Sequence, residues 1–588
     1  MAEPLGTLTR THTCGALRAG DVGAEAVLLG WVHRIRDLGG VTFIDVRDRA
    51  GVSQVVVREN DALMAVAKRL RSEFVVGVAG MVQRRSEDTI NTKLGTGEVE
   101  VLAREIRILN EAKTPPFQIA EDSPVSEDVR LKYRYLDLRR PRLQHNMILR
   151  HHVTMAVRKY FDANGFLEIE TPILTKSTPE GARDFLVPSR VHPGEFYALP
   201  QSPQIFKQIL MISGMDRYFQ IVKCFRDEDQ RADRQLEFTQ IDVEMSFARP
   251  DLVYGLIEPL MRVIFKEIGR DAPLPIRRMP YAEAIAKYGS DKPDLRFGLE
   301  IHDLSDIFKD SEFRVFKQIV ADGGVIRAFA VPKGNSWTRS QIDVLVDQAK
   351  QMGFSGLIWV RPGEPPTSSV KALTEGTLRA AIARTGASAE DLVLMAGGEA
   401  DHASKLLGNL RLAIAKKESL AKPDAYEFLW VTEFPLLEYH EEDGRWYSMH
   451  HPFTSPLDED VDKLESDPGV VRAKAYDLVL NGSEIGGGSI RIHDAALQSR
   501  IFRRLGIEEE EAKLRFGFFL EALAYGTPPH GGIALGVDRI VAILCGESSI
   551  REVIAFPKTA NAIDLMSDAP SPVDARQLKE LHIKIDQK

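Results

Sequence analysis

The segment CFRDEDQRADRQLEFTQIDVE, residues 224–244, joins a charged stretch to a polar pattern typical of a strand. Gln240, Asp242 and Glu244 alternate with apolar residues, which is the period of a strand with two distinct faces. Arginine presents a planar fork that matches phosphate or carboxylate, and strand carboxylates can position an amine or a metal. An anion-binding site and a solvated hairpin with surface ion pairs are equally good interpretations of this segment alone. Its arginines are Arg226, Arg231 and Arg234.

Other segments add polar groups, although each by itself has a structural explanation. QSPQIFKQILM, which starts at Gln201, predicts a helix start; TPEGARDF, residues 178–185, is a glycine-containing loop; and GIALGVDRIV predicts a strand-to-helix transition at which glycine permits close approach of a ligand. The adjacent His450 and His451 are more often structural than catalytic, and the glycine run in NGSEIGGGSIRIH is more often a turn or a packing site. Together these segments contribute Glu180, Ser202, Gln204, Lys207, His450, Asp477, Glu484, Arg491, Gly536, Asp538 and Arg539.

The composition is that of an ordinary globular protein with several domains. The chain has 588 residues, which predicts roughly three or four domains, with 44% apolar and 27% charged residues. No run of about 18 apolar residues and no apolar signal core occurs, so we expect a cytoplasmic protein without a membrane span. Three widely spaced cysteines argue against a disulfide framework or a structural zinc site. The net charge of −9 does not exclude nucleic acid, because local basic patches decide such binding.

The elements that position these groups fall into successive regions. Five short β-prone runs in the first 110 residues predict a small barrel, with an OB-fold as the leading candidate. The Pro-rich stretch EAKTPPFQIAEDSP, residues 111–124, is predicted to be a linker. HHVTMAVRKYFDANGF predicts a helix that ends near Gly165, followed by the short strand LEIETPIL. The charged stretch RDEDQRADRQLE is expected to be an exposed loop between two strands, and the last residues an extended surface tail.

Taken together, these residues resemble the class II aminoacyl-tRNA synthetases, and among them the bacterial type of aspartyl-tRNA synthetase. FLEIETPIL with its preceding helix is similar to the first class II signature, FRDED with the polar strand to the second, and GIALGVDRI to the third. KYRYLDLRRP, residues 132–141, is also shared, and the similarity covers nearly the whole chain in order. Neither a P-loop nor a dinucleotide-binding glycine motif occurs.

The resemblance implies an α+β multidomain chain. It combines an N-terminal OB-fold barrel with a class II catalytic domain, whose antiparallel sheet is interrupted by an inserted α/β module. The expected domains are an anticodon-binding barrel at 1–110, a hinge at 111–140, the catalytic domain at 141–287 and 423–560, the inserted domain at 288–422 and a C-terminal extension at 561–588.

The resemblance also assigns an adenylate-forming site. Arg226 and Arg539 are implied as catalytic residues at the α- and γ-phosphates of ATP, and Asp477 and Glu484 as the holders of Mg²⁺. The implied ATP-binding set is Arg226, Asp227, Glu228, Gln235, Glu484, Gly536, Val537, Asp538 and Arg539. The implied set around L-aspartate is Glu180, Ser202, Gln204, Lys207, Arg226, Asp242, His450 and Arg491.

Such a site must bring two anions together. The α-carboxylate of aspartate attacks the α-phosphorus of ATP, and because it is already a nucleophile, cations and orientation matter more than a general base. Lys207 and Arg491 would face the side-chain carboxylate, and neutral asparagine would leave them without a counterion. Arg226, Arg491 and Arg539 must therefore line one shared hollow.

In the barrel, an aromatic residue lies beside cations. Phe43 on one strand and Arg34 and Arg36 on the preceding strand suit the stacking of a splayed single-stranded base, while a place in the barrel core is an equally good interpretation of Phe43. Val56 occupies a position where some relatives carry an aromatic residue, so stacking rests on Phe43. The residues implied to read the anticodon are Arg36, Phe43, Gln54 and Glu100.

The resemblance implies ATP, L-aspartate, the aspartate tRNA and a second copy of the chain as partners, since the first signature builds the dimer interface in the family. The asparagine tRNA stays open as a second acceptor: Leu38 in RDLGG resembles the strict type, and the loop SEDTIN is less clear. The alternatives are an asparaginyl or lysyl synthetase and a non-catalytic tRNA-binding paralogue. The long insertion and the Lys207–Arg491 pair favour aspartate, and the intact ATP and Mg²⁺ residues disfavour the paralogue.

Overall fold

The computed structural model describes residues 2–178, 182–353 and 356–586, in two compact units. The first unit comprises Met1–Ile148 and Arg551–Ser571, and the second comprises Leu149–Ile550 and Pro572–Lys588. No helix in these described ranges is long and apolar enough to cross a membrane.

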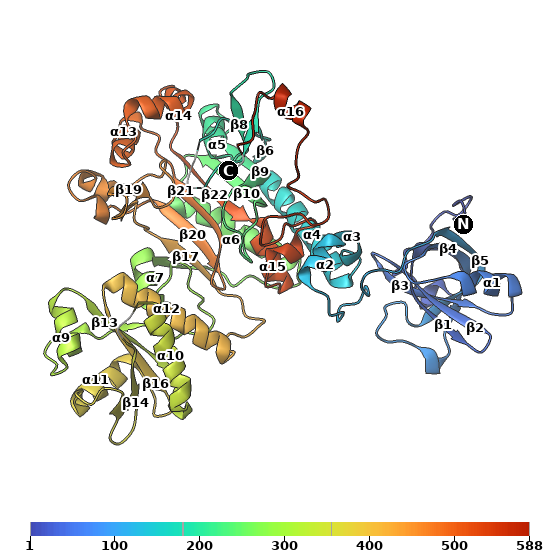
Figure 1. The fold of residues 1–588 in the computed structure, drawn as a ribbon, viewed down its shortest axis with the longest axis horizontal. Coiled ribbons are helices and arrows are strands. Elements are labelled where there is room, and N and C mark those ends of the chain that lie inside the picture. Colours follow the sequence, from blue (N-terminus) through green and yellow to red (C-terminus); the bar gives the residue numbers. More distant parts are fainter. Residues whose placement is uncertain (1, 179–181, 354–355, 587–588) are drawn as a thin grey trace. The chain divides into compact units, whose positions relative to one another are not determined.

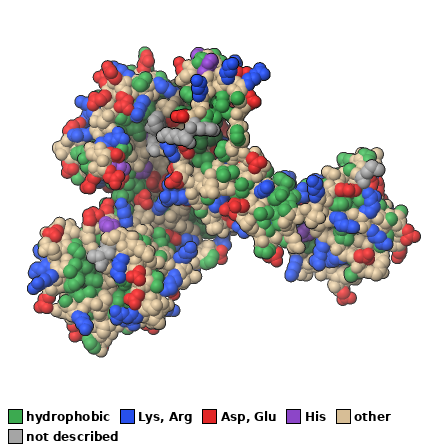
Figure 2. Space-filling view, viewed as in Figure 1, with side chains coloured by type: hydrophobic (Ala, Val, Ile, Leu, Met, Phe, Trp, Pro, Cys, Tyr) green, Lys and Arg blue, Asp and Glu red, His purple; other side chains and the backbone are tan. Residues whose placement is uncertain are grey.

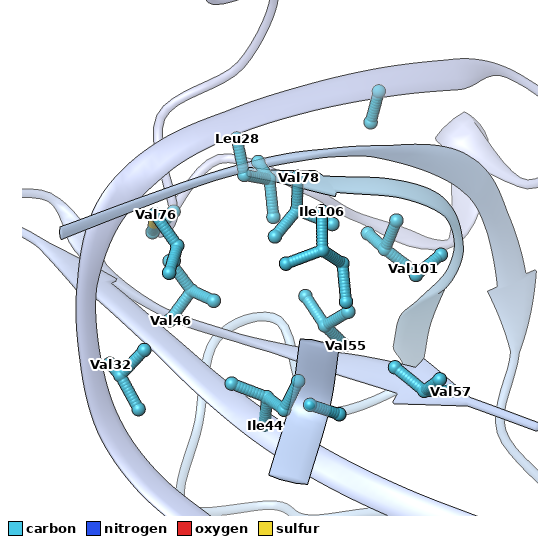
Figure 3. Packing of buried hydrophobic residues seen from close by; sticks show 14 of the residues in the cluster. Leu28, Val32, Ile44, Val46, Val55, Val57, Val76, Val78, Val101 and Ile106 are labelled. Atoms are coloured by element: carbon cyan, nitrogen blue, oxygen red, sulfur yellow. The ribbon is translucent and has the colours of Figure 1, made fainter. Parts of the chain in front are cut away.

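The first unit is built around a closed five-stranded barrel (Figure 1). Its strand order is β1-β2-β3-β5-β4, in which β3 and β5 pair in parallel and the other neighbours are antiparallel. Alternate apolar residues such as Leu28, Ile44 and Val76 are fully buried inside it, as Figure 3 shows. This confirms the predicted OB-fold barrel. Its elements are β1 (Glu25–Leu38), β2 (Val41–Asp48), β3 (Gly51–Val57), α1 (Asp61–Arg69), β4 (Val75–Arg84) and β5 (Val99–Asn110).

Part of the segment expected as a hinge is helical and tied to a distant part of the chain. It contains α2 (Glu127–Lys132) and α3 (Arg134–Asp137). The buried guanidinium of Arg134 pairs with Asp137 at 2.8 Å and donates to the carbonyl oxygens of Arg551, Ile554 and Ala555. Residues 551–555 therefore pack on the KYRYLDLRRP segment.

The second unit contains an eight-stranded sheet of order β11-β17-β20-β21-β22-β10-β9-β6. The six central strands are antiparallel, as predicted, but β11 and β6 pair in parallel with β17 and β9, so the sheet is mixed. Of the predicted strand LEIETPIL only Leu167 and Glu168 pair, as the two-residue β6, and Pro172, four residues further on, could not donate to a longer ladder. The strands are β6 (Leu167–Glu168), β9 (Arg217–Phe225), β10 (Glu237–Ser246), β11 (Arg277–Pro280), β17 (Phe428–Thr432), β20 (Ala475–Leu480), β21 (Ser483–Ile490) and β22 (His530–Gly536).

Helices and two small hairpins surround this sheet. The helix predicted to end near Gly165 is α4, which ends at Ala163, and Gly165 has a φ of 75°. The predicted strand-to-helix transition is the step from β22 to α15. The elements are α4 (Pro141–Ala163), β7 (Leu186–Pro188), β8 (Phe196–Ala198), α5 (Gln204–Ile212), α6 (Pro250–Lys266), α7 (Tyr281–Tyr288), β18 (Leu437–His440), β19 (Arg445–Ser448), α13 (Ala495–Arg504), α14 (Glu509–Leu523), α15 (Val537–Cys545) and α16 (Ala575–Glu580).

The inserted segment has a sheet and hydrophobic cores of its own. Its five strands run in the order β12-β13-β16-β14-β15, and helices surround them (Figure 1). Phe329, Leu394 and Leu407 are fully buried in one of these cores. The elements are β12 (His302–Asp303), α8 (Ser305–Phe308), α9 (Arg314–Ala321), β13 (Val325–Val331), α10 (Arg339–Gln351), β14 (Ile358–Arg361), β15 (Thr367–Ser368), α11 (Glu375–Thr385), β16 (Leu392–Gly398) and α12 (Ala400–Lys417).

Candidate active site and nucleic-acid interface

One cavity of about 500 Å³ lies on the eight-stranded sheet of the second unit. Arg226, Arg491 and Arg539 all line it, so the three cations share one hollow as the sequence required. Asp227 and Val537 do not line it: the side chain of Asp227 is 44% exposed beside Arg183, and Val537 is fully buried. Glu180 lies outside the described residues. The other predicted residues in the wall are Ser202, Gln204, Lys207, Glu228, Gln235, Asp242, His450, Asp477, Glu484, Gly536 and Asp538.

The polar face of β10 forms part of the cavity floor. Gln240 and Asp242 line the cavity, whereas Ile241 and Val243 are buried with no more than 1% exposure. The strand therefore has a packed apolar face and a polar face toward a hollow rather than toward bulk solvent. This excludes the interpretation of the segment as a solvated hairpin.

Four buried charges meet at one end of this floor. The ammonium of Lys207, on α5, lies 2.7 Å from Asp242 Oδ1 and 3.4 Å from Glu244 Oε2. The guanidinium of Arg491 contacts the same Glu244 through two nitrogens, at 3.1 and 3.2 Å. The four side chains are at most 5% exposed. Two cations and two acids therefore form a charge-balanced cluster, here called the floor cluster.

The acids of the floor cluster differ in their electrostatics. Burial raises the pKa of Asp242, and the attraction of Lys207 offsets this only in part. Burial acts the same way on Glu244, but Arg491 and Lys207 outweigh it and lower the pKa of that carboxyl. Although burial disfavours a charged guanidinium, Glu244 raises the pKa of Arg491. Glu244 therefore holds Arg491 in its charged form.

Several buried polar atoms in the cavity wall lack hydrogen-bond partners within the described part of the chain. Asp242 Oδ2 and the side-chain nitrogen of Gln204 are among them. An unpaired buried polar group is costly, and one in a cavity wall indicates a polar ligand. The arrangement fits a small molecule that offers both a donor and an acceptor.

The opposite end of the cavity carries the other arginines. The guanidinium of Arg226 lies 5.1 Å from the centre of the Phe238 ring. Arg539, in the first turn of α15, donates to the carbonyl oxygen of Glu484 at 2.7 Å and lies 3.4 Å from Asp233 Oδ2. Gln235 is only 3% exposed, so the expectation of a fully exposed loop is wrong at this residue, which lines the cavity. This end can accept a polyanion.

Two acids lie near each other, diagonally across neighbouring strands. Asp477 lies on β20 and Glu484 on β21, and a Cβ added to Gly487 would be 2.6 Å from Asp477 Oδ1 and 3.6 Å from Glu484 Oε1. Burial and the charge of Asp477 raise the pKa of Glu484. His450 Nε2 lies 3.4 Å from Asp477, and although burial alone would lower the pKa of His450, the charge of Asp477 raises it. A cation would relieve the repulsion between the carboxylates.

The glycines of β21 and β22 allow the strands to approach closely. A Cβ on Gly488 would lie 2.1 Å from the carbonyl oxygen of Gly532, and one on Gly532 would lie 2.4 Å from Glu244 Oε2. The glycine run of β21 is therefore a packing site that also lines the cavity, and Gly532 of β22 leaves room for the Glu244 carboxylate.

The sequence analysis left some supporting residues unassigned. Glu244 was considered, with Asp242, as a carboxylate that could position an amine or a metal, but it was not included in the implied site, and the period-two alternation was the signal that placed it beside Asp242. Ser489 accepts a hydrogen bond from Arg491 at 2.8 Å, and the fully buried His530 lies 3.0 Å from Gln208. No sequence pattern marked these two: the contact of His530 joins segments 322 residues apart, and a lone serine two residues before an arginine is not a distinctive signal.

In the first unit, the four predicted anticodon residues form one network on the barrel. Arg36 donates to Gln54 at 3.0 Å, and Gln54 donates to Glu100 at 2.9 Å. Phe43 is half-buried, with the Arg36 guanidinium 5.8 Å from its ring centre, so it is not a core residue. On the barrel face in Figure 2, basic and acidic side chains are interspersed. The network offers an aromatic ring next to hydrogen-bonding groups, as a splayed base requires.

Comparisons with known proteins identify the families to which the two units are similar. The family model of class II tRNA synthetases (D, K and N) matches residues 126–560, and that of the OB-fold nucleic acid binding domain matches residues 26–109. A protein of Caldanaerobacter subterraneus named aspartate–tRNA(Asp/Asn) ligase is 55% identical over the whole of both chains. One of Ruminiclostridium cellulolyticum named aspartate–tRNA ligase is 53% identical, also over the whole of both chains.

Solved structures share the fold at much lower identity. A putative aspartyl-tRNA synthetase from Leishmania major has a TM-score of 0.60 at 18% identity, over 95% of this chain and 96% of the other. The asparaginyl-tRNA synthetase of Pyrococcus horikoshii has a TM-score of 0.58 at 19% identity, over 93% and 98%. Because the class II family model matches residues 126–560 and full-length aspartate–tRNA ligases are 53–55% identical, the chain belongs to the class II aminoacyl-tRNA synthetases, in the bacterial aspartyl-tRNA synthetase family.

Proposed function

We propose that this enzyme activates L-aspartate with ATP and transfers it to the 3′ end of the aspartate tRNA. The observation that carries the proposal is the floor cluster, which shares one cavity with Arg226 and Arg539. The cluster supplies two cations for a dicarboxylic amino acid, and the arginines at the other end supply charge for a triphosphate.

The chemical step depends on bringing two anions together. The aspartate α-carboxylate attacks the α-phosphorus, the bond to the leaving pyrophosphate breaks, and a terminal ribose hydroxyl of the tRNA then displaces AMP. Arg226 neutralises charge on the α-phosphate and Arg539 on the γ-phosphate, so that the carboxylate can approach in line. The fixed floor orients the amino acid, which converts the encounter into an intramolecular step.

The floor cluster accounts for the choice of aspartate. Arginine has five N–H donors, of which Glu244 and Ser489 use three on Arg491. The remaining donors of Arg491 and those of Lys207 are left for the substrate carboxylate. Asparagine would oppose its own NH₂ to these donors, and lysine would bring a third cation. Both alternatives to aspartate are therefore disfavoured.

We assign Mg²⁺ to Asp477 and Glu484. Magnesium is commonly held by one or two carboxylates together with substrate phosphates, and this acid pair fits that donor set. Burial and then the charge of Asp477 raise the pKa of Glu484, and a divalent cation would remove the second of these effects. When bound, the metal supplies positive charge to the phosphates of ATP.

The barrel network supports recognition of the tRNA anticodon, with Phe43 stacking on a base and Arg36, Gln54 and Glu100 bonding to its edges. A second acceptor, the asparagine tRNA, is favoured by the names of relatives such as the Caldanaerobacter ligase. Leu38, which resembles the strict type, is 66% exposed at the end of β1 and free to contact RNA.

A homodimer is supported by apolar side chains exposed along the first class II signature. Met155 on α4 is 39% exposed, and Leu167 on β6 and Leu174 beyond it are 52% and 51% exposed. A second copy of the chain would cover these side chains, since this segment forms the dimer interface in the family.

Arg491→Lys is expected to lower kcat/KM for aspartate about 100-fold in ATP–pyrophosphate exchange, because lysine cannot keep both contacts with Glu244. ATP binding should stay nearly unchanged. Arg500→Lys, at an exposed ion pair with Glu465, is the matched control. In the parent enzyme only aspartate, among aspartate, asparagine and lysine, should support exchange. Unchanged aspartate-dependent exchange in Arg491→Lys would contradict the assignment.

Asp477→Asn is expected to raise the Mg²⁺ concentration for half-maximal exchange at least about tenfold, or about 1.4 kcal/mol, because one of two anionic ligands is lost. Mg²⁺-dependent binding of a non-hydrolysable ATP analogue should weaken in parallel. Asp424→Asn, at an exposed pair with Arg270, serves as the control. If Asp477→Asn and the parent required the same Mg²⁺ concentration, the assignment of Mg²⁺ to Asp477 and Glu484 would be wrong.

Phe43→Ala is expected to weaken binding of the aspartate tRNA by about 1–3 kcal/mol, because one stacked base loses its platform. Dissociation constants and charging rates are measured with separate aspartate and asparagine tRNA transcripts. Val22→Ala, at a side chain 46% exposed outside the network, is the control. Equal tRNA affinity of the Phe43→Ala variant and the parent would count against stacking. Charging of the asparagine transcript would establish the second acceptor.

Sedimentation should give twice the chain mass of 65.7 kDa. Leu167→Asp should shift the protein toward the single-chain mass, since it places a charge in the proposed interface. Val344→Asp, at a 55% exposed position on α10, should not. A single-chain mass for the parent at micromolar concentration would refute the dimer.

A further inference from the structure

Asp538 directly precedes Arg539 in the first turn of α15, and its side chain is nearly buried. Its carboxylate is 5% exposed although the residue belongs to the cavity wall. The Asp538 carboxylate would repel the phosphates of ATP, which disfavours a direct contact between this side chain and the triphosphate. The contacts of the two carboxylate oxygens indicate a different role.

One oxygen completes the edge of a strand. The ladder between β10 and β22 ends at the pair Gln240–Gly536, so Thr239 lies one residue beyond its last partner. Asp538 Oδ2 accepts the backbone N–H of Thr239 at 2.8 Å. The side chain thus satisfies a buried donor that the ending strand β22 leaves without a strand partner.

The other oxygen binds a third element. Arg150, on α4, donates to Asp538 Oδ1 at 2.5 Å, and its side chain is 20% exposed. One carboxylate therefore joins α4, β10 and α15, which carry the first, second and third class II signatures. A charged donor on one oxygen and a backbone donor on the other fix both the position and the orientation of the carboxylate.

Of the two elements held this way, α15 carries Arg539, and β10 carries the aromatic ring over which Arg226 lies. Arg539 follows Asp538 directly, so fixing Asp538 fixes the backbone from which the Arg539 guanidinium reaches Glu484 O. Phe238 precedes Thr239 directly, and the Arg226 guanidinium lies over its ring. Asp538 is therefore linked to Arg539 as its neighbour in the chain, and to Arg226 through Thr239 and the ring of Phe238.

We propose that Asp538 is a positioning residue that, through Arg150 and Thr239, holds Arg226 and Arg539 in register with each other across the phosphates of ATP. The inference rests on the proposed function, and it moves Asp538 from the predicted ATP contacts to a place behind them. Because displacement of about 1 Å can cost about 100-fold in rate, the register of the two arginines matters in addition to their presence.

The test is Asp538→Asn, which preserves shape but opposes an amide NH₂ to the Arg150 guanidinium or gives up the Thr239 N–H. We expect kcat and kcat/KM for ATP in aspartate-dependent exchange to fall about 10- to 100-fold, with KM for aspartate within about twofold. Arg150→Gln should reproduce the defect. The double variant D538N/R150Q, in which two amides can bond to each other, should recover part of the loss.

The matched control is Asp460→Asn. Asp460 is also fully buried, and it accepts from the Arg472 guanidinium at 2.8 Å and from the Arg472 backbone N–H at 3.1 Å, but it does not line the cavity. It should lose thermal stability like Asp538→Asn while keeping the ATP parameters of the parent.

Parent-like ATP parameters in Asp538→Asn would overturn the proposal, and so would an equal ATP defect in Asp460→Asn, since the effect would then be one of general stability. A parent enzyme inactive in exchange would instead overturn the proposed function. These outcomes are distinguishable because the parent is measured first.

Discussion

The structure of the catalytic unit depends on the burial of four charges together. Lys207, Asp242, Glu244 and Arg491 are nearly inaccessible to solvent, and an unpaired charge there would be costly. Because two cations pair with two acids, the free-energy cost of burying the charges is offset. The same pairs orient the N–H donors of Lys207 and Arg491 that remain for a substrate. Three features bring these groups together: α5 packs on the sheet and carries Lys207, β10 has a polar face, and Gly532 of β22 leaves room for Glu244.

At the other end of the cavity, the positive charges must stay available rather than be neutralised by neighbouring acids. Arg226 and Arg539 have few strong acid partners: the first lies over the Phe238 ring and the second on a carbonyl oxygen and a distant carboxylate. Cations held by weak acceptors keep their charge available to a polyanion. The cavity thus has a neutralised end suited to a small zwitterion with an acidic side chain and an end rich in available positive charge, and the reaction requires both in one hollow.

Much of the fold followed from local patterns. The five strands of the barrel, the helix that ends before Gly165 and the step from β22 to α15 appear where alternation and glycine predicted them, because these signals are local in sequence. The expectation failed where tertiary contacts override local preference: LEIETPIL pairs over only two residues beside Pro172, Gln235 is buried within a charged loop, and the sheet gains parallel strands at both edges. The pairing of Glu244 with Arg491 was not predicted, because the two residues are 247 positions apart.

The sequence by itself determined the chemistry: which side chains are present, the period that places Asp242 and Glu244 on one strand face, and the resemblance that orders the three class II signatures. Only the tertiary structure decided which of these charges neutralise each other and which remain available, because pairing requires proximity below about 4 Å and segments such as 150, 239 and 538 come that close only in the folded chain. For the same reason, only the tertiary structure distinguishes a residue that contacts the substrate from one, such as Asp538, that positions the contacting residues.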